Sequence, residues 1–320
     1  MHKNFVKLLS CFLPKKQWRI DFRFKYGMKN LQNYGIKHIY NGEDGQNIIS
    51  NLITSDKPCL VCRFGGTEMR IVDYYLKNMH KDNVVFPDKL KNMIGDLSGF
   101  FPANDYLLSR FVSEFIELAE NIDVLAVWDT KSEKTMCEKY LNKNAKLVQL
   151  SALDTIVYDE PWSQHLQGKK VLLIHPFEDT IKSQFEKRKL LFKNSKILPE
   201  FELKTIKAVQ GLADSKKDLP FKTWFEALEF MKKQIDKTDF DIAIIGAGAY
   251  GIFLADYCKR IGKKAIHMGG STQLLFGIKG KRWETEYTYI RDNYYNEYWV
   301  RPSENEKPKG SVKVEGGCYW

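Results

Sequence analysis

The stretch DIAIIGAGAYG, residues 241–251, decides the fold class predicted for this chain. Residues 242–245 are apolar and mostly β-branched, as a fully buried strand requires. A helical pattern follows the glycines, Gly262 is placed to end that helix, and residues 264–267 have the pattern of the next strand. A strand, a glycine turn, a helix and a second strand form the repeating unit of open parallel sheets. The sequence therefore predicts an α/β, Rossmann-like fold with a mostly parallel sheet flanked by helices.

The glycine turn is also a candidate ligand site. Gly246, Gly248 and Gly251 have the spacing of a dinucleotide-binding turn, where the backbone comes close to a ligand and free N–H groups attract anions. NAD binding also requires an acidic residue at the end of the next strand, which here ends at His267. We therefore expect a nucleotide or another phosphate-bearing ligand, and not NAD. The alternative is a turn that only packs a helix closely against a strand.

Other parts of the chain have the same alternation of strand and helix. The predicted strands are residues 58–63, 122–128, 146–150, 170–175 and 203–209, and the predicted helices are 69–76, 105–119, 131–142, 179–192 and 223–235. Thr67 is the expected N-cap of the first of these helices, and residues 95–104 are expected to form a loop. The irregular stretch 154–168 is where two halves of one domain, residues 46–285, are expected to meet.

Polar residues and glycines follow the predicted strands. Because ligands bind outside the carboxyl ends of parallel strands, we expect these groups to line one edge of the sheet. The predicted catalytic residues are Glu68, which is also the candidate metal ligand, and His175. The predicted nucleotide- or substrate-binding residues are Arg63, Gly65, Gly66, Thr67, Gly246, Gly248, Tyr250, Gly251, His267, Gly269, Gly270 and Gln273. A helix-terminal charge for Glu68, a salt bridge for Arg63 and structural roles for both histidines are the alternatives. The Asp239-x-Asp241 pair resembles a metal motif but precedes its strand, so we expect it at the opposite edge.

Composition and charge restrict the possible functions. The chain has 320 residues and a net charge of +10, of which residues 1–40 contribute +8 through nine Lys or Arg and a single Asp21. This basic, partly aromatic segment is expected to form an amphipathic arm, residues 1–45, that either lies on an anionic membrane surface or packs on the domain. The nearly balanced charge of the rest argues against a nucleic-acid partner. No apolar run approaches the roughly 20 residues of a membrane span.

The cysteines and the C-terminal residues suggest a reduced, cytoplasmic protein with a folded tail. Cys59 and Cys62 lie inside a predicted apolar strand, so we expect core thiols and not a redox or zinc pair. Residues 286–320 are rich in Tyr and Trp and are expected to pack back over the domain, across the site. The chain lacks the motifs of serine hydrolases, zinc proteases and P-loop proteins.

Two stretches resemble a known family. Residues 61–70, VCRFGGTEMR, resemble the Arg-[Phe/Tyr]-Gly-Asp-Gly-Glu segment of bacterial GT-D-type glycosyltransferases. Residues 241–251 and 263–270 resemble that family's late glycine turn and the strand after it, and the order of elements is similar over residues 50–285. His175-Pro-Phe177 and residues 276–283 are similar to uncharacterised proteins of polysaccharide loci.

The resemblance implies a Rossmann-like hexosyltransferase that uses a nucleotide-sugar donor and usually a divalent metal, Mn or Mg. It assigns Arg63, Gly65 and Glu68 to the first motif, whereas Gly66 stands where the family has the Asp of an acidic pair, which puts metal dependence in question. The expected acceptor is a lipid-linked or glycan chain in cell-surface polysaccharide biosynthesis, at the cytoplasmic face of the membrane. The alternatives are an NAD(P)-dependent oxidoreductase and a non-catalytic nucleotide-sugar-binding protein of the same fold.

Overall fold

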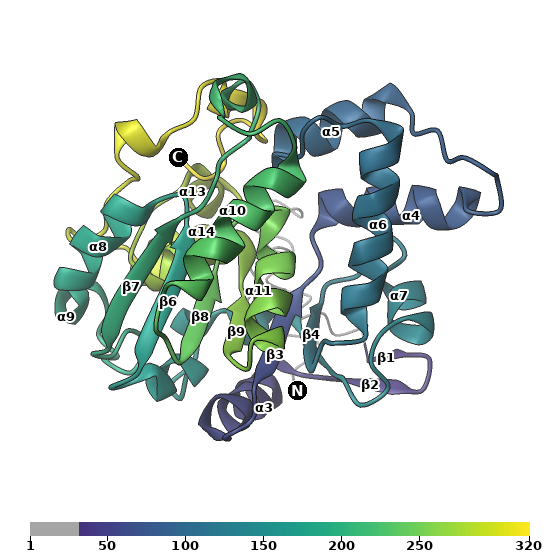
Figure 1. Ribbon diagram of the computed structural model, residues 1–320. Coiled ribbons are helices and arrows are strands. Elements are labelled where there is room, and N and C mark those ends of the chain that lie inside the picture. The colour runs from purple at the N-terminus through teal and green to yellow at the C-terminus, as the bar shows by residue number, and fades with distance from the viewer. Residues whose placement is uncertain (1–31) are drawn as a thin grey trace, which may run out of the picture.

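A nine-stranded sheet forms the centre of the molecule. The computed structural model describes residues 32–320, so residues 1–31 of the predicted arm lie outside the described part (Figure 1). The strand order is β1-β2-β5-β4-β3-β9-β8-β6-β7. The strands are β1 (Asn33–Tyr34), β2 (Lys37–Tyr40), β3 (Cys59–Arg63), β4 (Val124–Val127), β5 (Lys146–Gln149), β6 (Lys170–His175), β7 (Glu202–Lys207), β8 (Ile242–Ile245) and β9 (Lys264–His267). Only the short β1 is antiparallel to its neighbour, which confirms the predicted, mostly parallel α/β sheet.

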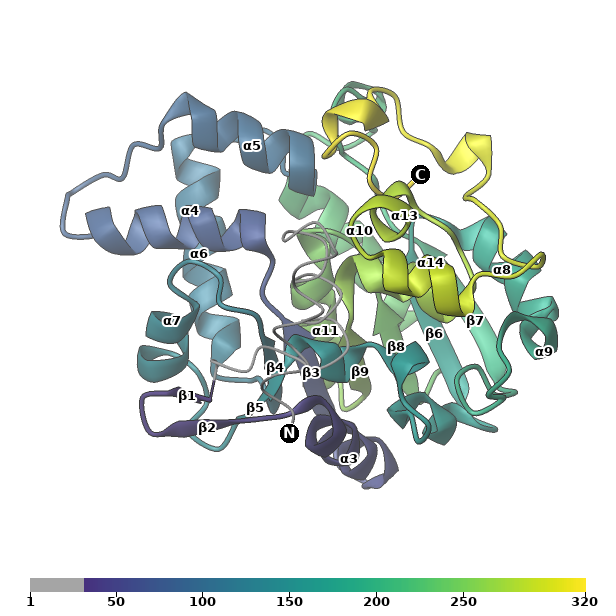
Figure 2. The same ribbon diagram turned by 180° about the vertical axis from the view of Figure 1, so that it is seen from behind.

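Helices cover both faces of the sheet. One face carries α4 (Gly66–Asn78), α5 (Asp88–Ser98), α6 (Asp105–Ala119), α7 (Glu133–Lys139), α10 (Trp224–Asp236) and α11 (Tyr250–Arg260). The other face, in front in Figure 2, carries α3 (Gly42–Thr54), α8 (Glu178–Glu186), α9 (Arg188–Leu191), α12 (Thr272–Leu275), α13 (Lys281–Thr285) and α14 (Thr288–Tyr294). The strands supply alternate side chains to the two layers: Leu60 and Cys62 of β3 pack into the first and Val61 into the second. Strands buried on both faces explain the continuous apolar runs of the sequence.

The connections around β3 and β9 place a crevice at the centre of the sheet. These two strands are parallel neighbours. The chain leaves β3 into α4 on one face and leaves β9 into α12 on the other. In open α/β sheets, ligands bind at such a point, outside the carboxyl ends of the strands.

Four local predictions differ from the structure. The N-cap of α4 is Gly65 and not Thr67, which is the second residue of the helix. Residues 88–98 form α5, so the expected loop at 95–104 begins inside a helix, where Gly95 is buried. The predicted helix 179–192 is interrupted between α8 and α9. Residues 33–40, within the range expected for the arm, form β1 and β2, and β2 joins the sheet beside β5.

The C-terminal residues pack on the domain near the carboxyl ends of the strands (Figure 1). Trp299, Val314 and Cys318 are each only 2% exposed. The five cysteines within residues 32–320 are buried free thiols, and Cys59 and Cys62 lie in β3. Asp241 accepts a hydrogen bond from the backbone N–H of Lys170 at 2.8 Å, at the amino end of β6 and away from the crevice. No helix within residues 32–320 has both the length and the apolar character that a membrane crossing requires.

Candidate functional site

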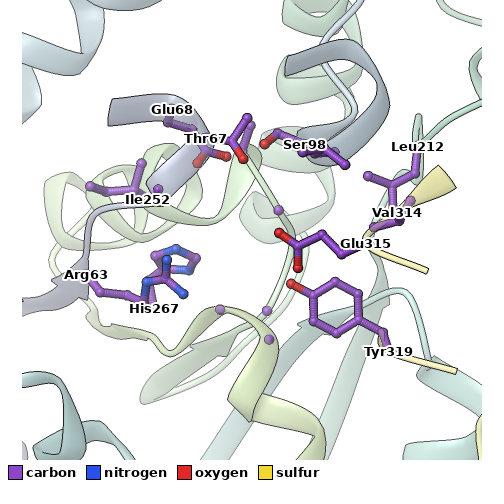
Figure 3. Close-up of a pocket in the computed structure, with 18 of the residues that line it drawn as sticks. Arg63, Thr67, Glu68, Ser98, Leu212, Ile252, His267, Val314, Glu315 and Tyr319 are labelled. Atoms are coloured by element: carbon purple, nitrogen blue, oxygen red, sulfur yellow. The ribbon is translucent and has the colours of Figure 1, made fainter. Parts of the chain in front are cut away.

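A cavity of about 500 Å³ opens at the carboxyl ends of the central strands. Its walls include residues that end or directly follow β3, β4, β6, β8 and β9, together with the start of α4 and the C-terminal segment. In Figure 3, Arg63, Glu68 and His267 lie on one side of this cavity and Val314, Glu315 and Tyr319 on the other. The predicted site residues that line it are Arg63, Gly65, Gly66, Thr67, Glu68, His175, Gly246, Gly248, His267, Gly269, Gly270 and Gln273.

The glycine turn presents unpaired backbone N–H groups beside the cavity. Within residues 32–320, the N–H groups of Ala247 and Gly248 have no hydrogen-bond partner. Gly248 adopts φ +52°, which disfavours any side chain there. At Gly246, a β-carbon would lie 2.6 Å from the His175 ring, so only glycine lets the turn approach the end of β6. The turn is thus shaped to hold an anion against its backbone.

Arg63 is fixed in place by the residues around it. Its Nε and Nη2 donate hydrogen bonds to the backbone carbonyl of Phe64, at 3.1 and 3.0 Å. The guanidinium also lies 4.8 Å from the centre of the Trp128 ring, and Trp128 Nε1 donates to the same carbonyl. Nη1 has no partner among the described residues and lies 3.1 Å from where a β-carbon of Gly269 would be. Arg63 therefore offers a pre-oriented donor to an anion in the cavity.

The two histidines are buried, neutral and in opposite tautomers. Burial lowers the pKa of His175 to about 3, and its Nδ1 accepts a hydrogen bond from Phe177 N–H, so the ring proton is on Nε2. Burial and the nearby Arg63 charge lower the pKa of His267 to about 3. His267 Nδ1 lies 3.3 Å from the carbonyl of Ile245, so it carries the proton and Nε2 is an acceptor. His175 is therefore a hydrogen-bond donor, which fits ligand binding better than the predicted catalytic role.

Glu68 is an acid without a protein partner. It lies in the first turn of α4, it is 8% exposed, and no residue in the described part of the chain forms a hydrogen bond or ion pair with it. Its carboxylate folds back over Gly65, since a β-carbon at Gly65 would lie within 1.8 Å of Oε2. A carboxylate placed in this way can accept a proton from a bound hydroxyl.

The loop after β4 brings a second carboxylate to the cavity wall. Asp129 has φ +62°, which is unusual for a residue with a side chain. The buried Glu133 maintains this conformation by accepting hydrogen bonds from the N–H groups of Trp128 and Asp129, at 3.1 and 2.7 Å, and from the Tyr34 hydroxyl. Burial raises the pKa of Glu133. Backbone strain of this kind is concentrated at functional sites.

Two predicted residues do not line the cavity, and several that do were missed. Tyr250 points into the core, where its ring stacks on Trp224 with 4.7 Å between centres. Gly251 gives room to the His267 ring, which would lie 2.1 Å from a β-carbon there. The lining residues missed as site candidates include Gln210, Arg282, Glu315, Tyr319 and Trp320, whereas Asp129 directly follows the strand predicted at 122–128. No local motif marks them, apart from the aromatic character of the tail.

The implied metal is not matched by a ligand set of the protein. The described residues contain no group of three or more His, Cys, Asp or Glu side chains that could hold a metal ion. At Gly66, where the resembled family has Asp, a β-carbon would lie 3.0 Å from the Trp128 ring. Trp128 thus takes the space of the missing carboxylate. The cationic side chains that line this cavity are Arg63, Arg70, Lys131 and Arg282.

Comparison with known proteins leaves the family open. No protein-family model matches the chain, and no curated protein matches it. A solved structure described as the selenomethionine-substituted form of domain of unknown function 1792 is similar over 94% of each chain, with 11% sequence identity and a TM-score of 0.47. This distant likeness carries no argument about function.

Proposed function

We propose that this chain is a glycosyltransferase, which moves a sugar from a nucleotide-sugar donor to an acceptor hydroxyl. One observation carries the proposal. A glycine turn with free N–H groups, a fixed guanidinium and an unpartnered buried carboxylate all line one cavity. Its volume of about 500 Å³ is in the range of ligand-binding clefts. Transfer from a diphosphate-linked sugar uses an anion site, which binds the diphosphate, and a nearby base, which takes the proton of the acceptor hydroxyl.

The diphosphate would bind between the turn and the arginine. Ala247 and Gly248 would donate their N–H groups to phosphate oxygens, and Arg63 Nη1 would donate from the neighbouring strand end. His175 would donate through Nε2 and remain neutral over the physiological pH range, because its pKa is lowered to about 3. His267 Nε2 would accept a hydrogen bond from a hydroxyl group of the nucleotide sugar.

The chemical step requires an acceptor hydroxyl activated by a base. Glu68 would take the proton as the hydroxyl oxygen bonds to the anomeric carbon. The bond between that carbon and the phosphate oxygen breaks, and the nucleoside diphosphate leaves with the electron pair. Arg63 and the turn would stabilise the negative charge that develops on the leaving group.

The alternatives have less support. In an NAD(P) enzyme, an acidic side chain at the end of β9 would bind the ribose, but His267 occupies this position and packs against Gly251. A non-catalytic sugar-nucleotide sensor would not need the unpartnered Glu68. The proposal also includes a lipid-linked or glycan acceptor and a role in surface polysaccharide assembly. It further includes membrane contact through residues 1–31, which the basic charge of that segment supports.

A donor screen tests the proposal. Calorimetric titration with UDP-, GDP- and dTDP-sugars, each with manganese and with EDTA, should give saturable binding of at least one donor. Because arginines and backbone N–H groups supply the neutralising charge, we expect EDTA to change the dissociation constant by less than about threefold. Absence of binding by all donors under both conditions would refute the proposed function. NAD and NADP serve as comparison ligands and should not bind.

A further inference from the structure

We propose that Arg282 is a second anion-binding residue of the cavity and that Glu315 is its internal counter-ion, which the ligand's phosphate displaces. This inference rests on the proposed function, since it takes the ligand to carry a diphosphate. Neither residue belongs to a recognisable motif. Their proximity results from the return of the C-terminal segment to the end of the sheet.

Arg282 is a largely buried cation in the cavity wall. Its side chain is 20% exposed, and it is the second residue of α13, with its backbone N–H bonded to the carbonyl of Cys318. The guanidinium lies 5.0 Å from the centre of the Tyr319 ring and donates to the Tyr319 hydroxyl at 3.4 Å. The charges of Arg282 and Arg63 both act on the Tyr319 hydroxyl, whose pKa is nevertheless raised by burial. Arg282 adds a second partly buried guanidinium to that of Arg63 for the two phosphates of a nucleoside diphosphate, in a wall that also includes the exposed Arg70 and Lys131.

Glu315 holds the guanidinium of Arg282 through a direct ion pair. Its side chain is 51% exposed, and Figure 3 shows its carboxylate turned into the cavity beside the Tyr319 hydroxyl. The backbone at Glu315 has φ +47°, and Gly316 and Gly317 continue with φ +72° and +82°. Val314 and Cys318, each 2% exposed, anchor this left-handed turn at both ends. A strained residue with a side chain thus aims a carboxylate at the cation of the cavity.

The two partners of this pair differ in what they lose on separation. Glu315 can turn into solvent and be hydrated, so its departure costs little. Arg282 cannot turn into solvent, because its side chain and guanidinium are mostly enclosed. A buried cation without a partner is strongly unfavourable. An incoming phosphate replaces the carboxylate and satisfies Arg282 in the same place. Until then, Glu315 occupies the guanidinium of Arg282 and so lowers the apparent affinity of the cavity for anions.

The test measures inorganic pyrophosphate binding by calorimetry in the wild-type chain and five full-length variants. E315Q removes the competing charge, and we expect roughly fivefold tighter binding. E304Q is the matched control, because Glu304 carries the same charge on the same tail with a 91% exposed side chain; it should change affinity less than about 1.5-fold. R282M should weaken binding at least about tenfold. In R282M/E315Q the gain from E315Q should disappear, because Glu315 acts through Arg282.

Each outcome decides the inference separately from the proposed function. Equal affinities for E315Q and E304Q overturn it, as does a gain from E315Q that persists without Arg282. Failure of both wild type and E315Q to bind pyrophosphate also overturns it. If pyrophosphate binds with the expected dependence on Glu315 while no nucleotide sugar binds, the inference stands and the proposed function fails. R282K, which retains the charge, should keep more of the affinity than R282M and so separates anion binding from loss of packing.

Discussion

Replacing Glu68 by Gln tests whether this carboxylate is a catalytic base or a structural group. Because Glu68 has no protein partner within residues 32–320, E68Q breaks no hydrogen bond or ion pair in that part of the fold. The only expected loss of stability is the interaction of the charge with the start of α4, about 0.3–1 kcal/mol. Loss of a general base should instead lower kcat by about 10²- to 10⁴-fold. Donor affinity should change little, since Arg63 and the glycine turn are unaltered.

Glu226 provides a matched control for this substitution. It is the third residue of the 13-residue helix α10, as Glu68 is of the 13-residue helix α4. Glu226, however, accepts a hydrogen bond from the N–H of Lys222 at 2.7 Å and lies outside the cavity. E226Q should leave kcat unchanged and cost no more than about 1 kcal/mol of stability, because the Gln oxygen can still accept this hydrogen bond.

Urea denaturation and single-turnover assays with the donor identified by the screen measure both effects. A loss of more than about 2 kcal/mol in E68Q, at unchanged kcat, would mean that Glu68 is a structural cap. That result would refute the assignment of Glu68 as the base. A fall in kcat with stability close to wild type is the expected outcome.

Two further predictions concern buried groups around the site. G251A should destabilise the fold by about 1–3 kcal/mol in chemical denaturation, because the new methyl would meet the His267 ring, which is 4% exposed and cannot move aside. The control G95A, in α5, should be neutral or stabilising. Equal effects of the two substitutions on the unfolding free energy would contradict this packing argument. Burial raises the pKa of Asp154 from 3.8 to about 7, so the folded state binds a proton that the unfolded chain releases, and the unfolding free energy should fall as pH rises from 4 to 7. The unfolding free energy of D154N should lack this decrease, so the difference between D154N and wild type should grow by up to about 4 kcal/mol between pH 4 and pH 8. Parallel curves of unfolding free energy against pH for the two proteins would exclude a raised pKa of Asp154.

The order of the helices and strands could be predicted because it depends on local patterns. The apolar runs of β3, β6 and β8 are buried on both faces of a parallel sheet, and that burial demands an uninterrupted hydrophobic sequence. Helix α6 begins and ends where its amphipathic pattern predicts. Helix α5 was missed because Gly95 disfavours a helix in isolation, whereas here it is buried in the interior of one.

The predicted site residues that line the cavity lie at the end of a strand or within the few residues that follow it. Arg63, His175 and His267 end their strands, so the parallel sheet brings them to one edge whatever the side chains do. Tyr250 was misjudged because sequence spacing does not give the direction of a side chain at the start of a helix. Its ring fits against Trp224, a residue from a different helix.

The sequence by itself determined the parallel sheet, the glycine turn at its edge and the strand ends that carry cations and imidazoles. Only the tertiary structure decided which way those side chains face, that Trp128 fills the space beside Gly66, and that Arg282 pairs with Glu315 in the cavity wall. The physical reason is the range of the interactions. Periodicity and turn chemistry act between residues a few positions apart, whereas these contacts join segments that are distant in the chain and meet only when the whole sheet has formed.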